Sequence, residues 1–215
     1  MSTLASRQTC GFVAVVVFLM FTALGFWVVR NGEPAPLVVW ERSLVGRSTL
    51  VAWWLTWSCY IQVLAPIAVI LLIVAWLVPA WRGRAIFSVV SLLLCWRGAD
   101  LFQHLFARPR PPDWVVKHET AFSYPSSHAA IATGFYALWA VMLYKSELPR
   151  AARIAAGLML AAFALAICWA RLALGAHYLT DLLGGVLLGV TIVAAMLSIV
   201  PIKPFWAGRS RAAAE

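Results

Sequence analysis

Acidic residues are scarce in this chain, which has only eight Asp and Glu side chains among its 215 residues. Charged residues of both signs make up 12% of the sequence, whereas hydrophobic residues make up 63%. A soluble domain contains roughly 45–50% apolar residues, so this composition predicts an integral membrane protein. The chain has no low-complexity linker and no repeat of fixed period, and we therefore expect a single membrane-embedded domain over residues 1–215.

The small number of acidic and cysteine residues also limits metal chemistry. The four cysteines lie within or beside apolar runs and lack the spacing of metal ligands, so we interpret them as small buried residues: Cys10, Cys59, Cys95 and Cys168. Near the polar motifs described below, the carboxylates are Asp113, Glu119 and Asp181. They give little support to a magnesium site, and the sequence predicts neither a metal nor another cofactor.

Six apolar runs have about the 20-residue length that spans a bilayer as a helix, and they predict an all-α bundle of six transmembrane helices. They lie near residues 10–29, 58–78, 85–106, 127–144, 153–169 and 178–200. The first run lacks a small-residue cleavage signature, so we expect a retained helix and not a removed signal peptide. The stretch Leu37–Trp57 is rich in tryptophan and broken by charges. It is typical of a helix in the headgroup region, although it could also be a plain connector.

Two smaller features within these runs carry structural predictions. Arg97 and Asp100 are three residues apart in the third run. We expect them to pair with each other, because charges inside a span are costly when unpaired, and the alternative is a contact with substrate. Gly185 and Gly189 form a small-xxx-small step in the last run. Such a step is typical of a helix-packing face.

The net charge of +9 does not indicate nucleic-acid binding, because the basic residues are spread among short loops and not gathered on one soluble face. With six spans, nine loop cations fall on one side of the membrane: Arg7, Arg82, Arg84, Lys145, Arg150, Arg153, Lys203, Arg209 and Arg211. Four fall on the other side once the motif arginines are set aside: Arg30, Arg42, Arg47 and Lys117. The positive-inside rule then places both termini in the cytoplasm.

Three polar groups interrupt the apolar sequence. They are Arg108-Pro109-Arg110-Pro111, Pro125-Ser126-Ser127-His128, and Arg171 with His177 and Asp181. Arginine binds phosphoryl oxygens in a planar fork, serine adds a donor, and two histidines can divide the nucleophile and acid roles. With six spans, the loops that carry these groups open on the same, extracytoplasmic side. The combination predicts a phosphate-handling site there.

His177 and Asp181 are four residues apart at the start of the last run, so in a helix they share one face. The carboxylate can fix the tautomer and orientation of the imidazole, which makes His177 a candidate nucleophile. Taken alone, this pair could also cap a membrane helix, and Arg171 could be an interfacial arginine. The spacing of all three together is more specific than either feature.

The three groups resemble the signature of the type 2 phosphatidic acid phosphatase superfamily: Lys-six-Arg-Pro, then Pro-Ser-Gly-His, then Ser-Arg-five-His-three-Asp. The resemblance covers roughly Gln103 to Asp181. It implies that His177 is the nucleophile that becomes a phosphohistidine, with Asp181 as its orienting partner. It further implies a general acid at His128 and phosphate contacts from Arg110, Arg171 and Ser126.

Three positions depart from that pattern: Gln103 replaces the lysine, Ser127 the glycine and Ala170 the serine. Glutamine donates hydrogen bonds but carries no charge, so the phosphate cradle loses a positive charge that Arg108 could replace. The backbone amide of Ser127 should still be offered to phosphate. We therefore include Gln103, Ser127 and Arg108 among the expected phosphate-binding residues, and expect the changes to affect substrate choice more than reaction type.

The leading hypothesis is an integral membrane enzyme that hydrolyses a lipid phosphate or diphosphate without metal. Resemblance to small six-span members of the family favours a polyprenyl diphosphate such as the undecaprenyl carrier, and a bacterial inner membrane. Phosphatidylglycerophosphate, phosphatidic acid and lipid A stay open as substrates.

One alternative function is a lipid phosphotransferase, which passes the phosphoryl group from His177 to another lipid. Another is a non-catalytic protein that binds or transports lipid phosphates. The expected partners are the bilayer and a membrane lipid, and the sequence does not predict the oligomeric state.

Overall fold

The computed structural model describes residues 3–112, 115, 120–146 and 148–200, and within them the chain forms helices and no strand. In chain order the helices are α1 (Thr3–Asn31), α2 (Ala35–Leu44), α3 (Thr49–Trp57), α4 (Ile61–Leu77), η1 (Pro79–Trp81), α5 (Arg82–Phe106), α6 (Ser127–Ile131), η2 (Ala132–Ala137), α7 (Leu138–Tyr144), α8 (Arg150–Ala173) and α9 (Leu179–Ile199). The expected all-α fold is confirmed.

Each of the six predicted apolar runs is helical, but the runs differ in how well they suit a membrane crossing. By length and apolar composition, four helices of the described part could cross: α1, α5 together with η1, α8 and α9. Helices α3 and α4 add a fifth if they form one span, which is bent by 41°. The run over residues 127–144 is divided, because a π-helical segment, η2, separates α6 from α7. The count of six spans stays a prediction.

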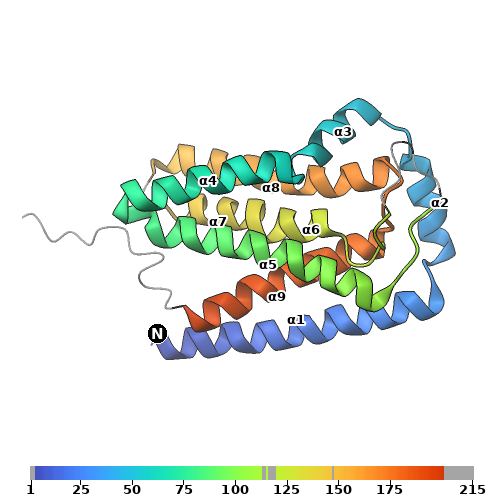
Figure 1. Cartoon of the computed structure of the whole chain (residues 1–215), viewed down its shortest axis with the longest axis horizontal. Coiled ribbons are helices and arrows are strands. Elements are labelled where there is room, and N and C mark those ends of the chain that lie inside the picture. The colour runs from blue at the N-terminus through green and yellow to red at the C-terminus, as the bar shows by residue number, and fades with distance from the viewer. Residues whose placement is uncertain (1–2, 113–114, 116–119, 147, 201–215) are drawn as a thin grey trace, which may run out of the picture.

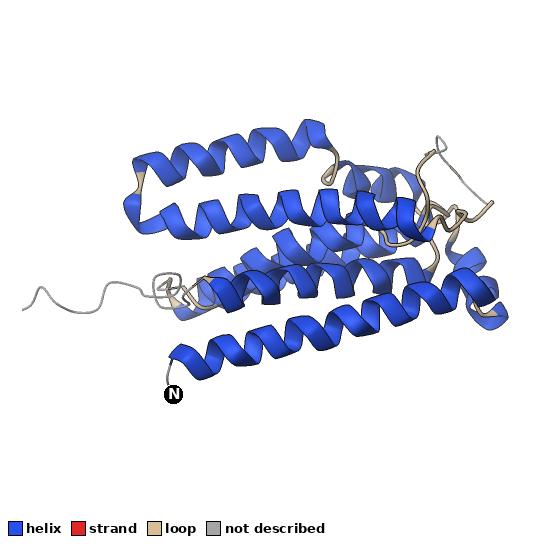
Figure 2. Ribbon diagram, turned by 60° about the horizontal axis from the view of Figure 1, so that its bottom comes forward, coloured by secondary structure: helices blue, strands red, loops and turns tan. Residues whose placement is uncertain are grey.

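The long helices lie roughly side by side in one bundle (Figures 1 and 2). Helix α1 packs along α9. Near the start of α1, Arg7 donates hydrogen bonds to the carbonyl oxygens of Ser198 (2.8 Å) and Ile199 (3.0 Å). The last carbonyls of a helix lack intrahelical donors, and a cation there complements the helix dipole. The start of α1 and the end of α9 therefore share one end of the bundle, and α2 lies at the opposite end (Figure 1).

Tyr124, in the connection between α5 and α6, joins that connection to α1 and α9. Its ring is fully buried, stacks on Phe21 at a centroid distance of 5.6 Å, and donates its hydroxyl to the Phe21 carbonyl at 2.6 Å. A Cβ at Gly184 would lie 2.6 Å from Cζ of this ring. Glycine at that position therefore allows α9 to pack directly against the tyrosine.

The expected packing face of Gly185 and Gly189 is confirmed. A Cβ at Gly185 would lie 2.7 Å from the Cβ of Ala129, and one at Gly189 would lie 2.8 Å from the Cβ of Thr133. Both separations are shorter than carbon atoms tolerate, so only glycine lets α9 approach α6 and η2 this closely. This contact fixes the first turn of α6 against the first turns of α9.

Two local expectations need correction. The stretch Leu37–Trp57 is not one helix but α2 and α3, separated by a turn in which Gly46 has a φ of 82°. The expected ion pair within α5 is wrong: Asp100 lies 3.9 Å from Nδ1 of His104, and the guanidinium of Arg97 lies over the ring of Trp96 at 5.7 Å. Both charged side chains point outward from the bundle, where a neighbour on the same helix is the nearer partner.

Candidate active site

The connection between α8 and α9 brings Arg171 and His177 to the same end of the bundle. Arg171 lies in the last turn of α8, and Gly175, with a φ of 66°, then reverses the chain. A positive φ is accessible to glycine without the steric cost that other residues bear. The N–H of Ala176 closes the turn by donating to the carbonyl oxygen of Arg171 at 2.9 Å. His177 therefore follows the turn directly and precedes Leu179, the first residue of α9, by two positions.

The segment that carries Ser126 and His128 is held against α5 on one side and α9 on the other. The side-chain amide of Gln103 donates to the carbonyl oxygen of Pro125 at 2.8 Å, and the N–H of Ser126 donates to the carbonyl oxygen of Asp181 at 3.0 Å. The hydroxyl of Ser126 accepts from the N–H of Ala129 at 3.4 Å and so caps α6. The second and third motif groups are thus joined through the backbone.

His177 has an arginine at one ring nitrogen and a carboxylate at the other. Nη1 of Arg110 lies 3.0 Å from Nε2 of His177 and also donates to the carbonyl oxygen of Ala176 at 3.0 Å. On the opposite edge, Nδ1 lies 3.6 Å from Oδ2 of Asp181 and 3.4 Å from the hydroxyl of Ser123. The imidazole is only 2% exposed. His177 and Asp181 thus lie side by side as expected, although His177 precedes α9 and does not share a helix face with Asp181.

Asp181 is fully buried and receives donors on both carboxylate oxygens. Oδ1 accepts from Nη1 of Arg108 at 2.5 Å. Oδ2 accepts from the hydroxyl of Ser123 and from the N–H of Tyr178, the latter at 2.9 Å. A buried carboxylate needs such donors, because without them it would lose its hydration with no compensation. These contacts fix the oxygen that faces His177.

Arg108 has a second role beside the phosphate contact that we expect from its sequence position. Its guanidinium, in a residue only 3% exposed, contacts three protein side chains: Asp181, Thr180 at 2.8 Å and Glu33 at 2.9 Å. It also lies over the ring of Tyr178, 4.5 Å from its centroid. Both terminal nitrogens donate to protein groups, so a contact between Arg108 and phosphate stays a prediction.

Two glutamates that the motif analysis did not select bind the start of α9. Glu41 accepts from the N–H of Leu179 at 2.6 Å, and Glu33 accepts from the N–H of Thr180 at 3.4 Å and from its hydroxyl. Carboxylates are stabilised there because the first amides of a helix lack intrahelical acceptors and carry the positive end of its dipole. The sequence offered one signal: acidic residues are so rare in this chain that two within nine positions are unusual.

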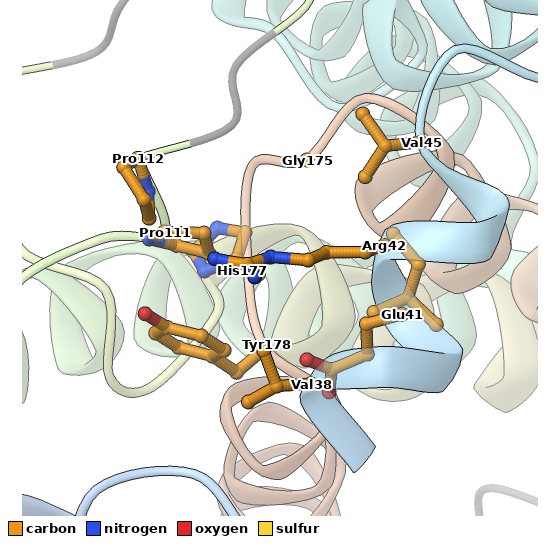
Figure 3. Close-up of a pocket in the computed structure, with 10 residues that line it drawn as sticks. Val38, Glu41, Arg42, Val45, Pro111, Pro112, Gly175, His177 and Tyr178 are labelled. Atoms are coloured by element: carbon orange, nitrogen blue, oxygen red, sulfur yellow. The ribbon is translucent and has the colours of Figure 1, made fainter. Parts of the chain in front are cut away.

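A small pocket of about 30 Å³ lies beside His177, between α2 and the chain that enters α9. Figure 3 shows Glu41 and Arg42 extending from α2 toward His177 and Tyr178, with Pro111 on the far side. Burial, assisted by the charge of Glu33, raises the pKa of Glu41 from 4.5 to about 7. Helix α2 therefore contributes a cation and a titratable acid to the surroundings of the nucleophile, and neither was predicted.

His128 and Ser127 lie at a second, larger cavity of about 490 Å³ between α4, α5 and α6. Its other lining residues are almost all apolar: Cys59, Tyr60, Ile61, Leu64, Ala65, Ala68, Val69, Leu72, Val89, Leu92, Leu93, Trp96 and Ile131. The ring of His128 packs edge-on against Tyr60 at a centroid distance of 5.4 Å. This histidine is thus the polar end of an apolar space.

The remaining predicted residues lie at the same end of the bundle. Arg171 is 1% exposed in the last turn of α8, next to Leu172, which packs with Ala129 of α6 and Leu182 of α9. Asp113 and Glu119 lie outside the described residues. Within the described part, no group of three or more His, Cys, Asp or Glu side chains is arranged to hold a metal ion. Beside Nε2 of His177 the charged neighbour is the guanidinium of Arg110, and such a cation suits an anionic ligand.

Comparison with known proteins adds to this picture. The family model of the PAP2 superfamily matches residues 83–204, which is more than half of the chain. Among solved structures, the chain is similar to a transmembrane PAP2-type phosphatidylglycerolphosphate phosphatase from Bacillus subtilis, with a TM-score of 0.72 and 22% identity, over 87% of this chain and 94% of that one. No curated protein matched. The apolar helices and this shared fold identify an integral membrane protein, and the chain belongs to the PAP2 superfamily, the type 2 phosphatidic acid phosphatases.

Proposed function

We propose that this protein is a membrane phosphatase that hydrolyses a lipid phosphate or diphosphate through a phosphohistidine at His177. The observation that carries the proposal is the buried imidazole with Arg110 at Nε2 and Asp181 at Nδ1. A nucleophile for phosphorus needs one nitrogen free of its proton and a cation beside the incoming phosphoryl oxygens. This arrangement offers both. Capping of a membrane helix would need neither the arginine nor the burial.

The proposed reaction follows from the different neighbours of the two ring nitrogens of His177. Because an ionised carboxylate only accepts, Asp181 favours a proton on Nδ1 and keeps a lone pair on Nε2. Arg110 donates to that lone pair here, and in the proposed reaction its guanidinium turns to the incoming phosphoryl oxygens so that Nε2 can attack phosphorus. An N–P bond forms as the P–O bond to the lipid breaks, and the departing oxygen takes a proton from His128. The imidazole ring then carries positive charge next to Asp181. Water, deprotonated by His128, next cleaves the N–P bond and releases phosphate.

Phosphate oxygens would be held by Arg110 and Arg171, with further donors at Ser126 and Ser127. Ser126 and Ser127 begin the Pro-Ser-Ser-His segment, which is held at the end of the bundle that carries His177 by the bond from Ser126 to the carbonyl oxygen of Asp181. Gln103 adds no charge here, and its amide is already bound to Pro125. The cradle then depends on arginines, whose forked donors match two phosphoryl oxygens at once.

The apolar cavity at His128 supports a lipid as the substrate. Its volume of about 490 Å³ and its apolar walls suit a hydrocarbon chain, and the histidine at its end is the proposed acid. In this proposal α1, α4, α5, the α6 to α7 series, α8 and α9 form six spans, with cytoplasmic termini and an extracytoplasmic site in a bacterial inner membrane. A polyprenyl diphosphate such as the undecaprenyl carrier is our first candidate. Phosphatidylglycerophosphate, the substrate named for the similar Bacillus protein, is the second.

The test is phosphate release by purified protein in detergent with a chelator present. A polyprenyl diphosphate, phosphatidylglycerophosphate and phosphatidic acid would be compared, with His177→Ala as the inactive control. Release that the variant loses supports a histidine phosphatase, and dependence on an added divalent metal would contradict a metal-free reaction. If lipid binds without release, adding a second lipid as acceptor distinguishes a phosphotransferase from a protein that only binds.

A further inference from the structure

Glu33, in the short connection between α1 and α2, reaches the catalytic end of the bundle through Arg108. Its Oε2 lies 2.9 Å from Nη2 of Arg108, and both side chains are almost completely buried, at 2% and 4% exposed. Nη1 of the same guanidinium binds Oδ1 of Asp181. The result is a row of three charges, Glu33, Arg108 and Asp181, which ends at the imidazole of His177.

The hydroxyl of Thr180 ties this row to the start of α9. It accepts from Nη1 of Arg108 at 2.8 Å and donates to Oε2 of Glu33. The guanidinium is thus fixed on both sides, and its orientation toward Asp181 depends on the carboxylate opposite. Glu33 lies outside the part of the chain that the family model matches, residues 83–204. None of the motif patterns includes this residue.

The charge of this row matters for the proposed reaction. Arg108 and Asp181 alone would form a neutral pair, and a neutral pair stabilises a neighbouring cation poorly. With Glu33 the row carries a net charge of −1. When the N–P bond forms at Nε2, the imidazole becomes cationic, and a buried net negative charge beside Nδ1 stabilises that cation.

We propose that Glu33 is a positioning residue for the nucleophile, which holds Arg108 in place and preserves the negative charge that Asp181 presents to His177. This inference rests on the proposed phosphohistidine reaction. Other charged and titratable groups face the row and its imidazole: Arg110 at Nε2 of His177, Glu41 and Arg42 from α2, and Tyr178 at the start of α9. All of them are unchanged in the Glu33 variants. Glu33 differs from Glu41 in that it binds the arginine directly.

The first arm of the test compares Glu33→Gln with Glu33→Asp, and with Asp100→Asn as a matched control. Glutamine keeps the size and hydrogen-bonding oxygen of Glu33 but removes its charge, whereas aspartate keeps the charge. Asp100 is a carboxylate about half exposed on α5, and its ion-pair contact is His104 on the same helix. We expect Glu33→Gln to lower kcat about 10- to 100-fold with KM changed less than about threefold, and Glu33→Asp to retain more activity. Asp100→Asn should match wild type.

The pH profile separates this role from a merely structural one. Without Glu33, the potential at His177 becomes more positive, so its imidazolium form is disfavoured and the ring stays neutral to lower pH. The acidic limb of kcat/KM should therefore move to lower pH in Glu33→Gln and stay in place in Glu33→Asp. A loss of activity with an unmoved limb, equal in the two variants, would overturn the proposal.

A double-variant cycle tests whether Glu33 acts through Arg108. Replacing both residues, as Glu33→Gln with Arg108→Gln, restores the net charge of −1. The double variant should therefore be less impaired than the product of the two single losses. Losses that multiply would show that the two residues act independently and would contradict the inference.

Orthovanadate binding provides a readout that does not need turnover. Vanadate is a phosphate-like oxyanion that accepts a histidine nitrogen, and tryptophan fluorescence can report its binding in a chain with 12 Trp. Glu33→Gln should weaken this binding about tenfold or more, and the double variant should recover part of it. If wild type binds vanadate but releases phosphate from no lipid, the proposed function fails while the role of Glu33 is still decided by this cycle. Wild type that does neither would overturn both.

Discussion

The side-chain amide of Gln103 donates a 2.8 Å hydrogen bond to the carbonyl oxygen of Pro125, the residue that begins the Pro-Ser-Ser-His segment. Family members carry lysine at this position by the resemblance described above. Here a neutral donor from α5 positions the segment that contains Ser126 and His128. Gln103 is only 4% exposed, so water does not readily take the place of its side chain as the donor to the Pro125 carbonyl.

We therefore predict that Gln103→Ala lowers the free energy of unfolding by about 1–3 kcal/mol, because the Pro125 carbonyl stays buried without its donor. The value of kcat/KM should fall in parallel as the segment shifts. Gln62→Ala, an exposed glutamine on α4, is the matched control and should change neither quantity. Thermal denaturation and initial rates measure both effects, and an unchanged Tm in Gln103→Ala would contradict the prediction.

His128→Ala should affect lipid monophosphates more than lipid diphosphates. A monoester expels an alkoxide that needs a proton from the acid, which is a contribution of about 10²–10⁴-fold. A diphosphate expels a stable phosphate and depends on the acid less. The ratio of kcat for the variant and for wild type on the two substrates measures this difference. Equal losses on both would mean that His128 does not protonate the leaving group.

Ser123→Ala should reduce kcat about tenfold or more, since hydrogen bonds to charged groups contribute about 1.5–3 kcal/mol. Ser123 donates to Asp181 and lies 3.4 Å from Nδ1 of His177, although it belongs to none of the three motif groups. Ser123→Thr keeps the hydroxyl and serves as the comparison. Rates close to wild type in the alanine variant would show that Arg108 and the Tyr178 amide suffice to hold Asp181.

Glu41→Gln should stabilise the protein at alkaline pH and not at acid pH. The pKa of Glu41 is raised by burial from 4.5 to about 7, so the folded state binds more protons between these values than the unfolded state. Its contribution to stability is full below about pH 4.5 and is lost as pH rises through about 7. Glutamine still accepts from Leu179 but cannot ionise. We expect its advantage to grow from near zero at about pH 5 to about 1–2 kcal/mol at about pH 8. A difference in Tm between Glu41→Gln and wild type that stays constant across this pH range would refute the prediction.

Gly185→Ala should separate α9 from the first turn of α6 and abolish activity in any protein that still folds. An added Cβ would lie 2.7 Å from Ala129 and 3.0 Å from the backbone nitrogen of Ala130, and overpacking of this kind costs about 1–3 kcal/mol or more. Gly98→Ala on α5 is the control, because its nearest contact, at 3.6 Å to Ile192, is ordinary. Circular dichroism and phosphate release would be measured on both.

The sequence predicts the helices well because hydrophobic length is a strong signal in a chain of this composition. All six runs are helical within a few residues, and the break at η2 was missed because a π-helical segment leaves the apolar pattern intact. The proximity of His177 and Asp181 was expected from helical spacing, but His177 lies in the turn before α9, so the side chains meet across the start of the helix and not along one face of it. Its surroundings were not: Glu33 lies 148 positions before Asp181, and no periodicity relates residues in different helices. The expected pair of Arg97 and Asp100 failed for a related reason, because spacing alone does not show which side chains face outward.

The contact between Glu33 and Arg108 also bears on where this protein can be divided. The family signature lies wholly in the later part of the chain, and a fragment that starts at residue 83 would contain every motif residue. It would keep the pair of Arg108 and Asp181 but lose Glu33, the carboxylate that holds the other side of the Arg108 guanidinium. The start of α9 would lose both glutamates as well. The part that holds the chemistry is therefore not a separable module, and truncation or domain-swap designs in this protein need to retain α1 and α2.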